Sequence, residues 1–248
     1  MMENKWLGSK TGQGFYKKEG KDILTLDLDT LEYRANKKAS FATLELTKTI
    51  EKPIDRFKVL VTGKDKAGDF YRKNFASMFQ YCSNRIPEIT DAFYKIDDAM
   101  KAGFGWENGP FEIWDAIGIE KGIELMKAEG YQPASWVTDM LATGNTSFYS
   151  IKDGATHFYS ISNKKVEKIP GQDAFIILNN IRERKKIWNN SDSIITDLGD
   201  GIINLEFTSK MNSIGAGVLQ GINKAIDIAE KDYNGLVIGN QGANFSVG

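Results

Sequence analysis

The sequence predicts an α-helical module followed by an incomplete α/β segment. Two observations carry this prediction. Apolar side chains recur at helical spacing between residues 66 and 129, where glycines interrupt the pattern. After residue 192 the pattern changes to strand, tight turn, strand, helix and strand, which is how an α/β fold begins.

The composition describes an ordinary globular protein and excludes several kinds of chemistry. Of the 248 residues, 41% are hydrophobic and 26% charged, and the formal net charge of −1 shows no basic excess for binding nucleic acid. One cysteine, Cys82, and one histidine, His157, exclude an internal disulfide and a Cys-rich zinc site, and they weaken any case for a catalytic triad. No apolar run approaches the roughly 20 residues that span a bilayer, and the amino terminus lacks a secretory signal. We therefore expect a cytoplasmic protein with no transmembrane segment, no metal site and no nucleic-acid partner.

The first fifty residues combine a glycine-rich turn with weaker patterns. Residues 6–16 hold three glycines followed by two aromatics, which predicts a turn closing against a core and matches neither the phosphate loop nor the dinucleotide fingerprint. Alternating leucines at 23–31 are typical of a strand, although an extended connector fits them equally. Residues 34–52 carry mixed helical signals, and we expect Pro53 to end any helix there.

Three helices are predicted in the middle of the chain. The strongest spans residues 66–86, where one apolar face includes Cys82 as a small buried hydrophobe rather than a nucleophile. Residues 91–103 and 119–129 give two more helices, separated by a glycine-rich break that ends at Gly109-Pro110. Together these helices predict a compact module of ~100 residues.

A hairpin and a charged segment follow the helices. Asp153-Gly154 separates two aromatic, β-favouring runs, so residues 147–162 predict a β-hairpin, with His157 in a structural or surface role on its second strand. Residues 163–190 are charged, most densely at 182–186. They are interpreted as a solvated helical face in a linker, with docking of an acidic partner as the alternative. A domain boundary is expected near residues 185–192.

The last segment contains one β-β-α-β unit. Two strands meet at a turn over 199–201, a helix follows at 214–230, and a short apolar strand lies at 236–239. A unit of this size buries too little surface to form a complete domain. We therefore expect residues 192–248 to be part of a larger domain, with an unpaired strand edge.

Residues 97–118 resemble the signature of the 3-hydroxyacyl-CoA dehydrogenase C-terminal domain. They carry, in the family's order, Asp97, Ala99-Met100, a Gly-x-Gly bend at 103–105, Gly-Pro-Phe-Glu at 109–112, Asp115 and Gly118. Glu107 replaces the usual proline, a departure common in second copies of the domain. Residues 6–16 resemble the tail with which a preceding copy ends.

Residues 199–248 resemble the amino-terminal part of an enoyl-CoA hydratase (crotonase) domain. The similarity rests on Asp200-Gly201, Leu205-Glu206-Phe207, Lys210-Met211-Asn212, Leu236-Val237-Ile238-Gly239 and Asn244-Phe245-Ser246-Val247-Gly248. The order, dehydrogenase before hydratase, is similar to a bacterial fatty-acid oxidation fusion protein. The resemblance implies a first dehydrogenase C-terminal domain ending at 1–18, a connector at 19–54, a second such helical domain with its hairpin at 55–162, a linker at 163–191, and a truncated crotonase domain at 192–248.

The resemblance implies part of a multifunctional fatty-acid β-oxidation enzyme that acts on acyl-CoA thioesters. No strand–Gly-x-Gly-x-x-Gly–helix unit is present, so NAD would bind the parent enzyme outside this chain, and coenzyme A would enter as part of the substrate. We expect the 248 residues alone to lack complete catalytic sites. The implied partners are acyl-CoA, the missing nucleotide-binding and crotonase parts of the parent chain, and a second copy in a homodimer.

The crotonase resemblance assigns a backbone role to Val247. In that family two backbone N–H groups hold the thioester oxyanion, and the first falls at Val247, where a strand gives way to a helix amino terminus. Met211 and Asn212 match a loop near the CoA moiety, and Gly248 joins them as a substrate-binding residue. The alternatives are a buried strand-end valine for Val247 and a helix-initiating cap for Asn212. The family's second donor and both glutamates would lie beyond Gly248.

Two other classes of function stay open. A helical scaffold or oligomerisation module without catalytic ancestry explains the missing His and Cys chemistry equally well, but not the α/β unit that begins at residue 192. Alternatively, residues 55–150 bind acyl-CoA without catalysing a reaction.

Overall fold

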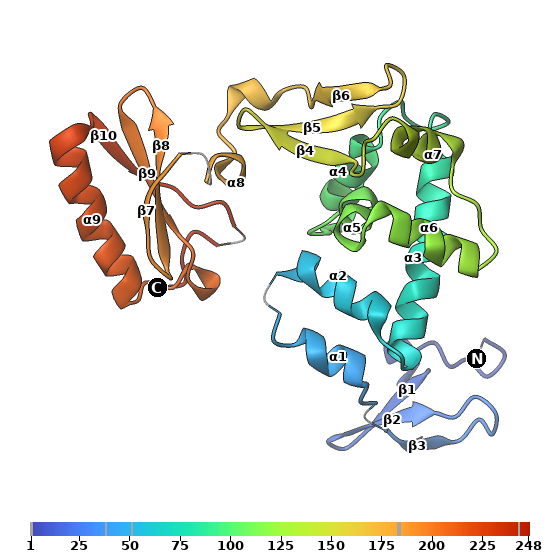
Figure 1. Cartoon of the computed structure of the whole chain (residues 1–248). Helices are drawn as coiled ribbons and strands as arrows, with labels where there is room; N and C mark the ends of the chain where they lie inside the picture. Colours follow the sequence, from blue (N-terminus) through green and yellow to red (C-terminus); the bar gives the residue numbers. More distant parts are fainter. Residues whose placement is uncertain (1, 38, 51, 183–184, 243) are drawn as a thin grey trace.

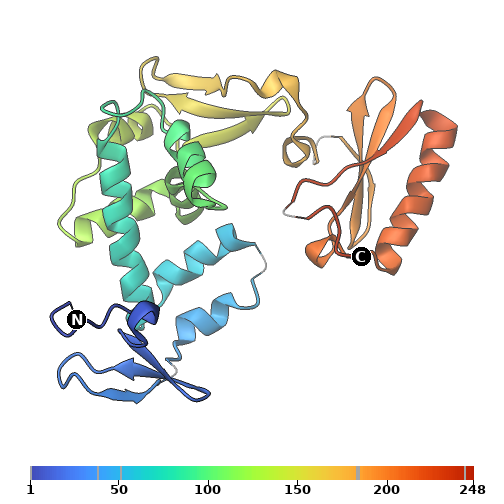
Figure 2. The same ribbon diagram turned by 180° about the vertical axis from the view of Figure 1, so that it is seen from behind.

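The chain folds into a mixture of helices and β-sheets, which Figure 1 and Figure 2 show from opposite sides. The computed structural model describes residues 2–37, 39–50, 52–182, 185–242 and 244–248. A small amino-terminal sheet adjoins a group of helices, a second sheet covers one end of these helices, and a third sheet carries the last helix. Within the described residues, no helix combines the length and the apolar character that crossing a membrane requires.

The amino-terminal sheet is antiparallel and consists of β1 (Tyr16–Glu19), β2 (Asp22–Leu26) and β3 (Tyr33–Ala35). The strand predicted at 23–31 is therefore present as β2, and its Leu26 is buried. The glycine-rich turn is also present, around the short 3-10 helix Ser9–Thr11. The expectation that its aromatics close against a core is wrong, because Phe15 and Tyr16 are 58% and 61% exposed.

The helical region contains more helices than the sequence predicted. Its helices are α1 (Ala42–Thr47), α2 (Pro53–Thr62), α3 (Lys66–Asn84), α4 (Tyr94–Phe104), α5 (Pro110–Ile117), α6 (Ile119–Ala128) and α7 (Ser135–Ala142). The three predicted helices are confirmed as α3, α4 and α6. The expectation that Pro53 ends a helix is wrong: it begins α2, because proline lacks an N–H that the first helical position does not need.

Aromatic side chains fill the core of the helical region. Trp114 is fully buried and stacks on Phe79 with ring centroids 4.8 Å apart. Its indole N–H donates to the Ile119 carbonyl at 3.0 Å, and the Trp136 indole N–H donates to the Ser83 carbonyl at 3.0 Å. Each large ring thus satisfies its one polar group inside the core.

The predicted hairpin is confirmed and carries a third strand. β4 (Tyr149–Lys152) pairs with β5 (Ala155–Ser160), and β5 pairs with β6 (Lys165–Lys168). Asp153 and Gly154 have positive φ angles of 53° and 75°, which a two-residue hairpin turn of this hand requires. The strand β6 falls in the segment that was interpreted as a helical linker face.

Between β6 and residue 182, the described residues form two short helices. They are the 3-10 helix Gln172–Ala174 and α8 (Leu178–Ile181). The interpretation of 163–190 as one helical face is therefore wrong, because β6 pairs along β5 instead. In the charged run 182–186, residues 183–184 lie outside the described residues, and Lys186 begins β7 (Lys186–Asn189).

The carboxyl-terminal sheet has the strand order β10-β9-β8-β7. β8 (Ser193–Gly199) and β9 (Ile202–Phe207) are antiparallel, whereas β10 (Gly235–Ile238) runs parallel to β9 after the crossing helix α9 (Ala216–Asp232). The predicted β-β-α-β order is confirmed. β7 pairs with β8, so this sheet includes residues that precede 192. Ile195, Ile203 and Leu205 are fully buried with Val218 of α9, which fixes the helix on one face of the sheet.

Candidate functional site

A cavity of about 1010 Å³, the central cavity, lies between α4, α5, the β4–β5 hairpin and the segment 169–180. Its charged lining residues are Asp98, Lys101, Glu112 and Asp115, and its lining also includes Tyr149 and several apolar side chains. A cavity of this size and mixed polarity is typical of small-molecule sites. Asp115 lines this cavity, and the buried Asp97 is joined to its lining through the Tyr149 hydroxyl.

Asp97 caps the amino terminus of α5 from a different helix. The N-cap of α5 is Gly109, which has no side chain to accept a hydrogen bond, and Asp97 of α4 supplies the missing acceptor. Its carboxylate accepts from the backbone N–H of Phe111 at 2.9 Å and of Glu112 at 3.1 Å. A Cβ at Gly109 would lie 2.3 Å from the Asp97 Cβ, so glycine is required for this approach.

Glu112 closes the same turn on its outer side. Its carboxylate accepts from the Gly109 N–H at 2.8 Å and forms a 2.7 Å ion pair with Lys101. Lys101 also lies 3.5 Å from Asp98. These contacts attach the α4–α5 loop to both helices that it connects.

Asp115 and Tyr149 join α5 to the hairpin. The Asp115 carboxylate accepts from the backbone N–H of Phe148 at 2.7 Å and of Tyr149 at 2.9 Å. The Tyr149 hydroxyl donates to the Asp97 carboxylate at 2.7 Å. One connected network therefore fixes the start of α5 and the start of β4, and we call Asp97, Asp115 and Tyr149 the carboxyl network.

Burial controls the ionisation of the carboxyl network. Desolvation raises the pKa of Asp97 to about 7, although donors from Phe111 and Tyr149 oppose this increase. Desolvation likewise raises the pKa of Asp115 to about 7. The pKa of the Tyr149 hydroxyl is raised by its own burial and by the negative charge of Asp97, so this hydroxyl stays protonated and donates.

The geometry of the network favours a positioning role over proton transfer. Raised carboxyl pKa values in a cavity are typical of catalytic acids and bases. Here, however, both oxygens of Asp97 and both of Asp115 already accept hydrogen bonds from backbone N–H groups. The carboxyl groups therefore hold α5 and the hairpin in place.

The four residues assigned by the crotonase resemblance lie close together at the carboxyl-terminal end. The Asn212 side-chain amide donates to the Asn244 carbonyl at 2.9 Å, and the Ile214 N–H donates to the Gly248 carbonyl at 3.0 Å. Met211 and Asn212 both have positive φ angles, 56° and 54°, and Met211 is 59% exposed. The loop 210–214 and the segment 244–248 thus form one surface.

Val247 itself is accessible within this surface. Its side chain is 52% exposed and lies in no strand, so the alternative of a buried strand-end valine does not hold. No described residue accepts a hydrogen bond from its backbone N–H. Asn212 does not cap α9, whose N-cap is Gly215. The resemblance implies that a helix begins at Val247, but the described residues between β10 and Gly248 form no helix.

Among the described residues, neither the one histidine nor the one cysteine is paired with a second catalytic side chain. His157 is partly buried on β5, and its Nδ1 lies 3.1 Å from the Ala155 carbonyl. Cys82 is half-buried on α3, where burial raises the pKa of its thiol to about 11. No group of three or more His, Cys, Asp or Glu side chains that could hold a metal ion occurs in the part of the chain that the structure describes.

Sequence reasoning did not assign any role to Asp97 or Asp115, although both belong to the quoted signature. The available signal was the pair Gly109-Pro110, because glycine at an N-cap followed by proline marks a helix start without its own capping side chain. Such a start needs an acceptor from elsewhere. A preceding helix that carries a buried aspartate is a candidate source.

Along its whole length the chain is similar in sequence to proteins named as fatty-acid oxidation enzymes. It is 42% identical over 249 residues to a probable 3-hydroxyacyl-CoA dehydrogenase of Bacillus subtilis, with 100% of this chain and 31% of the relative covered. It is 24% and 23% identical to putative fatty acid oxidation complex trifunctional enzymes of Rickettsia felis and Rickettsia prowazekii, again over 100% of this chain and 30% of each relative.

The chain thus spans about a third of the length of the curated relatives that it matches. No protein-family model matches it, and no solved structure matches it. The homologues support similarity to 3-hydroxyacyl-CoA dehydrogenases and fatty acid oxidation enzymes.

Proposed function

We propose that this chain is a positioning part of a multifunctional fatty-acid β-oxidation enzyme that acts on acyl-CoA thioesters. The observation that carries the proposal is the 42% identity to the Bacillus subtilis relative along the entire chain. Identity of this extent over helices, hairpin and carboxyl-terminal unit together indicates a shared arrangement rather than one shared motif.

The carboxyl network supports the dehydrogenase part of this proposal. The signature residues Asp97, Gly109 and Asp115 serve one physical purpose, which is to fix α5 against α4 and the hairpin. These contacts shape one wall of the central cavity. In the parent enzyme, residues 55–162 would act as a second dehydrogenase C-terminal domain. This domain would position the catalytic unit beside it.

NAD and coenzyme A enter this proposal through the parent enzyme. NAD would accept the hydride from the 3-hydroxyacyl substrate when bound. The chain's own residues do not fit a dinucleotide site, because the sequence holds no strand–Gly-x-Gly-x-x-Gly–helix unit. Acyl-CoA as ligand and a second copy as partner belong to the same proposal.

The carboxyl-terminal unit, residues 192–248, would be the start of an enoyl-CoA hydratase domain. The backbone N–H of Val247, which no described residue accepts from, supports an oxyanion-binding role, because such a donor has to be free to bind the thioester oxygen. Met211 and Asn212 lie on the same surface and would contact the CoA moiety. Gly248 would complete this substrate-binding set.

A chimaeric enzyme tests the proposed function. This chain replaces the matching segment of the Bacillus subtilis relative, and NADH formation from 3-hydroxybutyryl-CoA is followed. We expect the chimaera to keep the activity of the relative within about tenfold, since the replaced segment positions rather than reacts. A folded chimaera that binds NAD but forms no NADH would contradict the proposal, and it would favour an unrelated scaffold role.

A further inference from the structure

The segment that follows β10 is held by side-chain amides instead of by secondary structure. The described residues of 239–248 form no helix and no strand. At the start of this segment, the Asn204 side-chain amide donates to the Gly239 carbonyl at 3.2 Å. The path of the main chain therefore depends on individual side chains, whose contributions can be separated by substitution.

Asn240 joins two parts of the carboxyl-terminal unit that are far apart in sequence. Its side-chain carbonyl oxygen accepts from the Phe207 N–H at 2.7 Å, and its side-chain amide donates to the Phe245 carbonyl at 2.7 Å. The rings of Phe207 and Phe245 also lie side by side, with centroids 6.0 Å apart. One side chain thus connects the end of β9 to the residue two positions before Val247.

The bond from Phe207 to Asn240 replaces the next rung of the ladder between β9 and β10. The Gly239 N–H donates to the Leu205 carbonyl at 3.1 Å, as a parallel pair requires. In a continued parallel ladder, the Phe207 N–H would next donate to the Gly239 carbonyl. That carbonyl accepts from Asn204 instead, and Asn240 supplies the acceptor for Phe207. The main chain can therefore leave the sheet after β10 without leaving the Phe207 N–H unpaired.

The far end of the segment is fixed at Gly248. Its carbonyl accepts from the Ile214 N–H at 3.0 Å, and its own N–H donates to the Ser246 hydroxyl at 3.1 Å. Val247 thus lies between two held carbonyls, those of Phe245 and Gly248, and no described residue accepts from its N–H. An unpaired donor whose flanking peptides are both held is suited to binding an oxyanion without rearrangement.

We propose that Asn240 is a positioning residue, which fixes the Val247 backbone N–H for the thioester oxygen of an acyl-CoA substrate. Its effect is indirect, because it holds the Phe245 carbonyl. Without that hydrogen bond, the peptide unit after Phe245 could rotate about its two soft dihedral angles, and the Val247 N–H in the next peptide unit would move with it. This inference rests on the proposed function, because the donor that Asn240 positions belongs to the proposed hydratase site.

The chimaera tests this role when crotonyl-CoA hydration is measured beside NADH formation. Asn240→Ala removes both hydrogen bonds. It should lower kcat for hydration roughly tenfold to hundredfold and change KM by less than about twofold, because a displaced donor weakens binding of the transition state only. Asn240→Asp keeps an acceptor for the Phe207 N–H but has no donor for the Phe245 carbonyl, so its kcat should fall as far. NADH formation should stay unchanged in both variants, which shows that the rest of the enzyme is folded.

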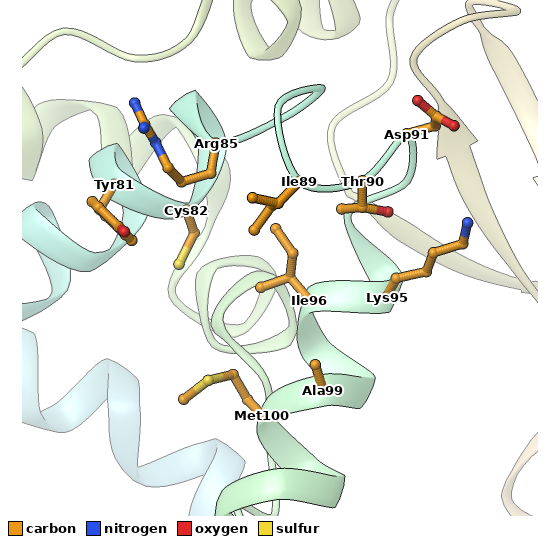
Figure 3. A pocket seen from close by; sticks show the side chains of 10 residues that line it. All are labelled: Tyr81, Cys82, Arg85, Ile89, Thr90, Asp91, Lys95, Ile96, Ala99 and Met100. Atoms are coloured by element: carbon orange, nitrogen blue, oxygen red, sulfur yellow. The ribbon is translucent and has the colours of Figure 1, made fainter.

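Two control variants should keep the hydration kinetics of the unmodified chimaera. Gln241, the neighbouring amide, accepts from the Leu178 N–H at 2.7 Å and donates to the Ile176 carbonyl at 2.9 Å. Gln241→Ala therefore also removes two hydrogen bonds from this segment, but it leaves the Phe245 carbonyl held. Lys95→Gln removes an exposed charge on α4, where Figure 3 shows the side chain pointing outward.

The isolated chain provides a readout that needs no activity. Hydrogen exchange followed by NMR measures how well the Phe207 amide is protected. This amide should exchange roughly tenfold faster in Asn240→Ala, which leaves it without an acceptor, and should stay protected in Asn240→Asp. Unchanged protection in Asn240→Ala would overturn the structural basis of the proposal.

The kinetic outcomes separate this proposal from the proposed function. Unchanged hydration kinetics in Asn240→Ala or in Asn240→Asp would overturn the role of Asn240 and leave the proposed function intact. An equal fall in kcat for Gln241→Ala would also overturn it, because any loosening of the segment would then suffice. A chimaera that forms NADH but does not hydrate crotonyl-CoA would contradict the hydratase part of the proposed function, and this proposal with it.

Discussion

Replacing Asp97 by alanine tests whether the carboxyl network holds the helical region together. The substitution leaves three donors without their acceptor, namely the Phe111 N–H at 2.9 Å, the Glu112 N–H at 3.1 Å and the Tyr149 hydroxyl at 2.7 Å. Each buried unsatisfied donor costs about 1–3 kcal/mol. Water from the central cavity compensates part of this cost, and removing the carboxyl group also removes its own desolvation penalty. We therefore expect a loss of about 3 kcal/mol in the free energy of unfolding.

Urea unfolding followed by tryptophan fluorescence measures this loss, because Trp114 and Trp136 are buried in the same core. With a slope of about 3 kcal/mol per molar, the midpoint should fall by about 1 M. Asp97→Asn keeps one acceptor and should lose about 1–2 kcal/mol. Asp98→Ala is the matched control: this neighbouring side chain is 65% exposed, and its loss should cost under about 0.5 kcal/mol. Equal midpoints for Asp97→Ala and Asp98→Ala would contradict a stabilising role for the Asp97 carboxyl group.

Two further predictions concern packing and pH. Gly122→Ala should destabilise the chain by about 1–3 kcal/mol, because the new Cβ would lie 2.0 Å from Trp114 Nε1. Gly103→Ala on α4 meets nothing within 4 Å and should stabilise the chain by up to about 1 kcal/mol. Thermal melting distinguishes the two variants, and a Gly122→Ala chain as stable as the wild type would contradict the close packing of Gly122 against Trp114. Burial raises the pKa of Asp97 and of Asp115 to about 7, so the folded state holds their protons more tightly than the unfolded state. The resulting stabilisation is fully present below about pH 4 and is lost as pH rises to about 7. Urea unfolding across this interval should show that loss, and in Asp97→Asn a smaller one; an identical pH dependence in the variant would contradict the assignment.

Local patterns predicted the elements that depend on neighbours in sequence. The hairpin followed from Asp153-Gly154, because its two positive φ angles suit these residues. The helix α3 and the β-β-α-β order followed from apolar periodicity alone. The helix α5 was missed because Gly109-Pro110 was interpreted as a break, whereas glycine at the N-cap and proline at the first helical position begin this helix.

Features that depend on distant contacts could not be predicted in the same way. The cap on α5 comes from Asp97, and the clamp on the hairpin joins Asp115 to residues 148–149, far along the chain. The strand β6 is charged, and it becomes a strand only because β5 offers a partner edge. The unpaired state of the Val247 amide among the described residues likewise depends on where the segment 244–248 packs against the loop at 210–214.

Turnover by the isolated chain tests the proposal that these 248 residues position the reaction of a fatty-acid oxidation enzyme and do not perform it. The folded chain is supplied with NAD and 3-hydroxybutyryl-CoA, and separately with crotonyl-CoA, with the Bacillus subtilis chimaera as the positive control. We expect NADH formation by the chimaera and none by the chain, and no hydration of crotonyl-CoA by the chain. Robust turnover of either substrate by the isolated chain would contradict it.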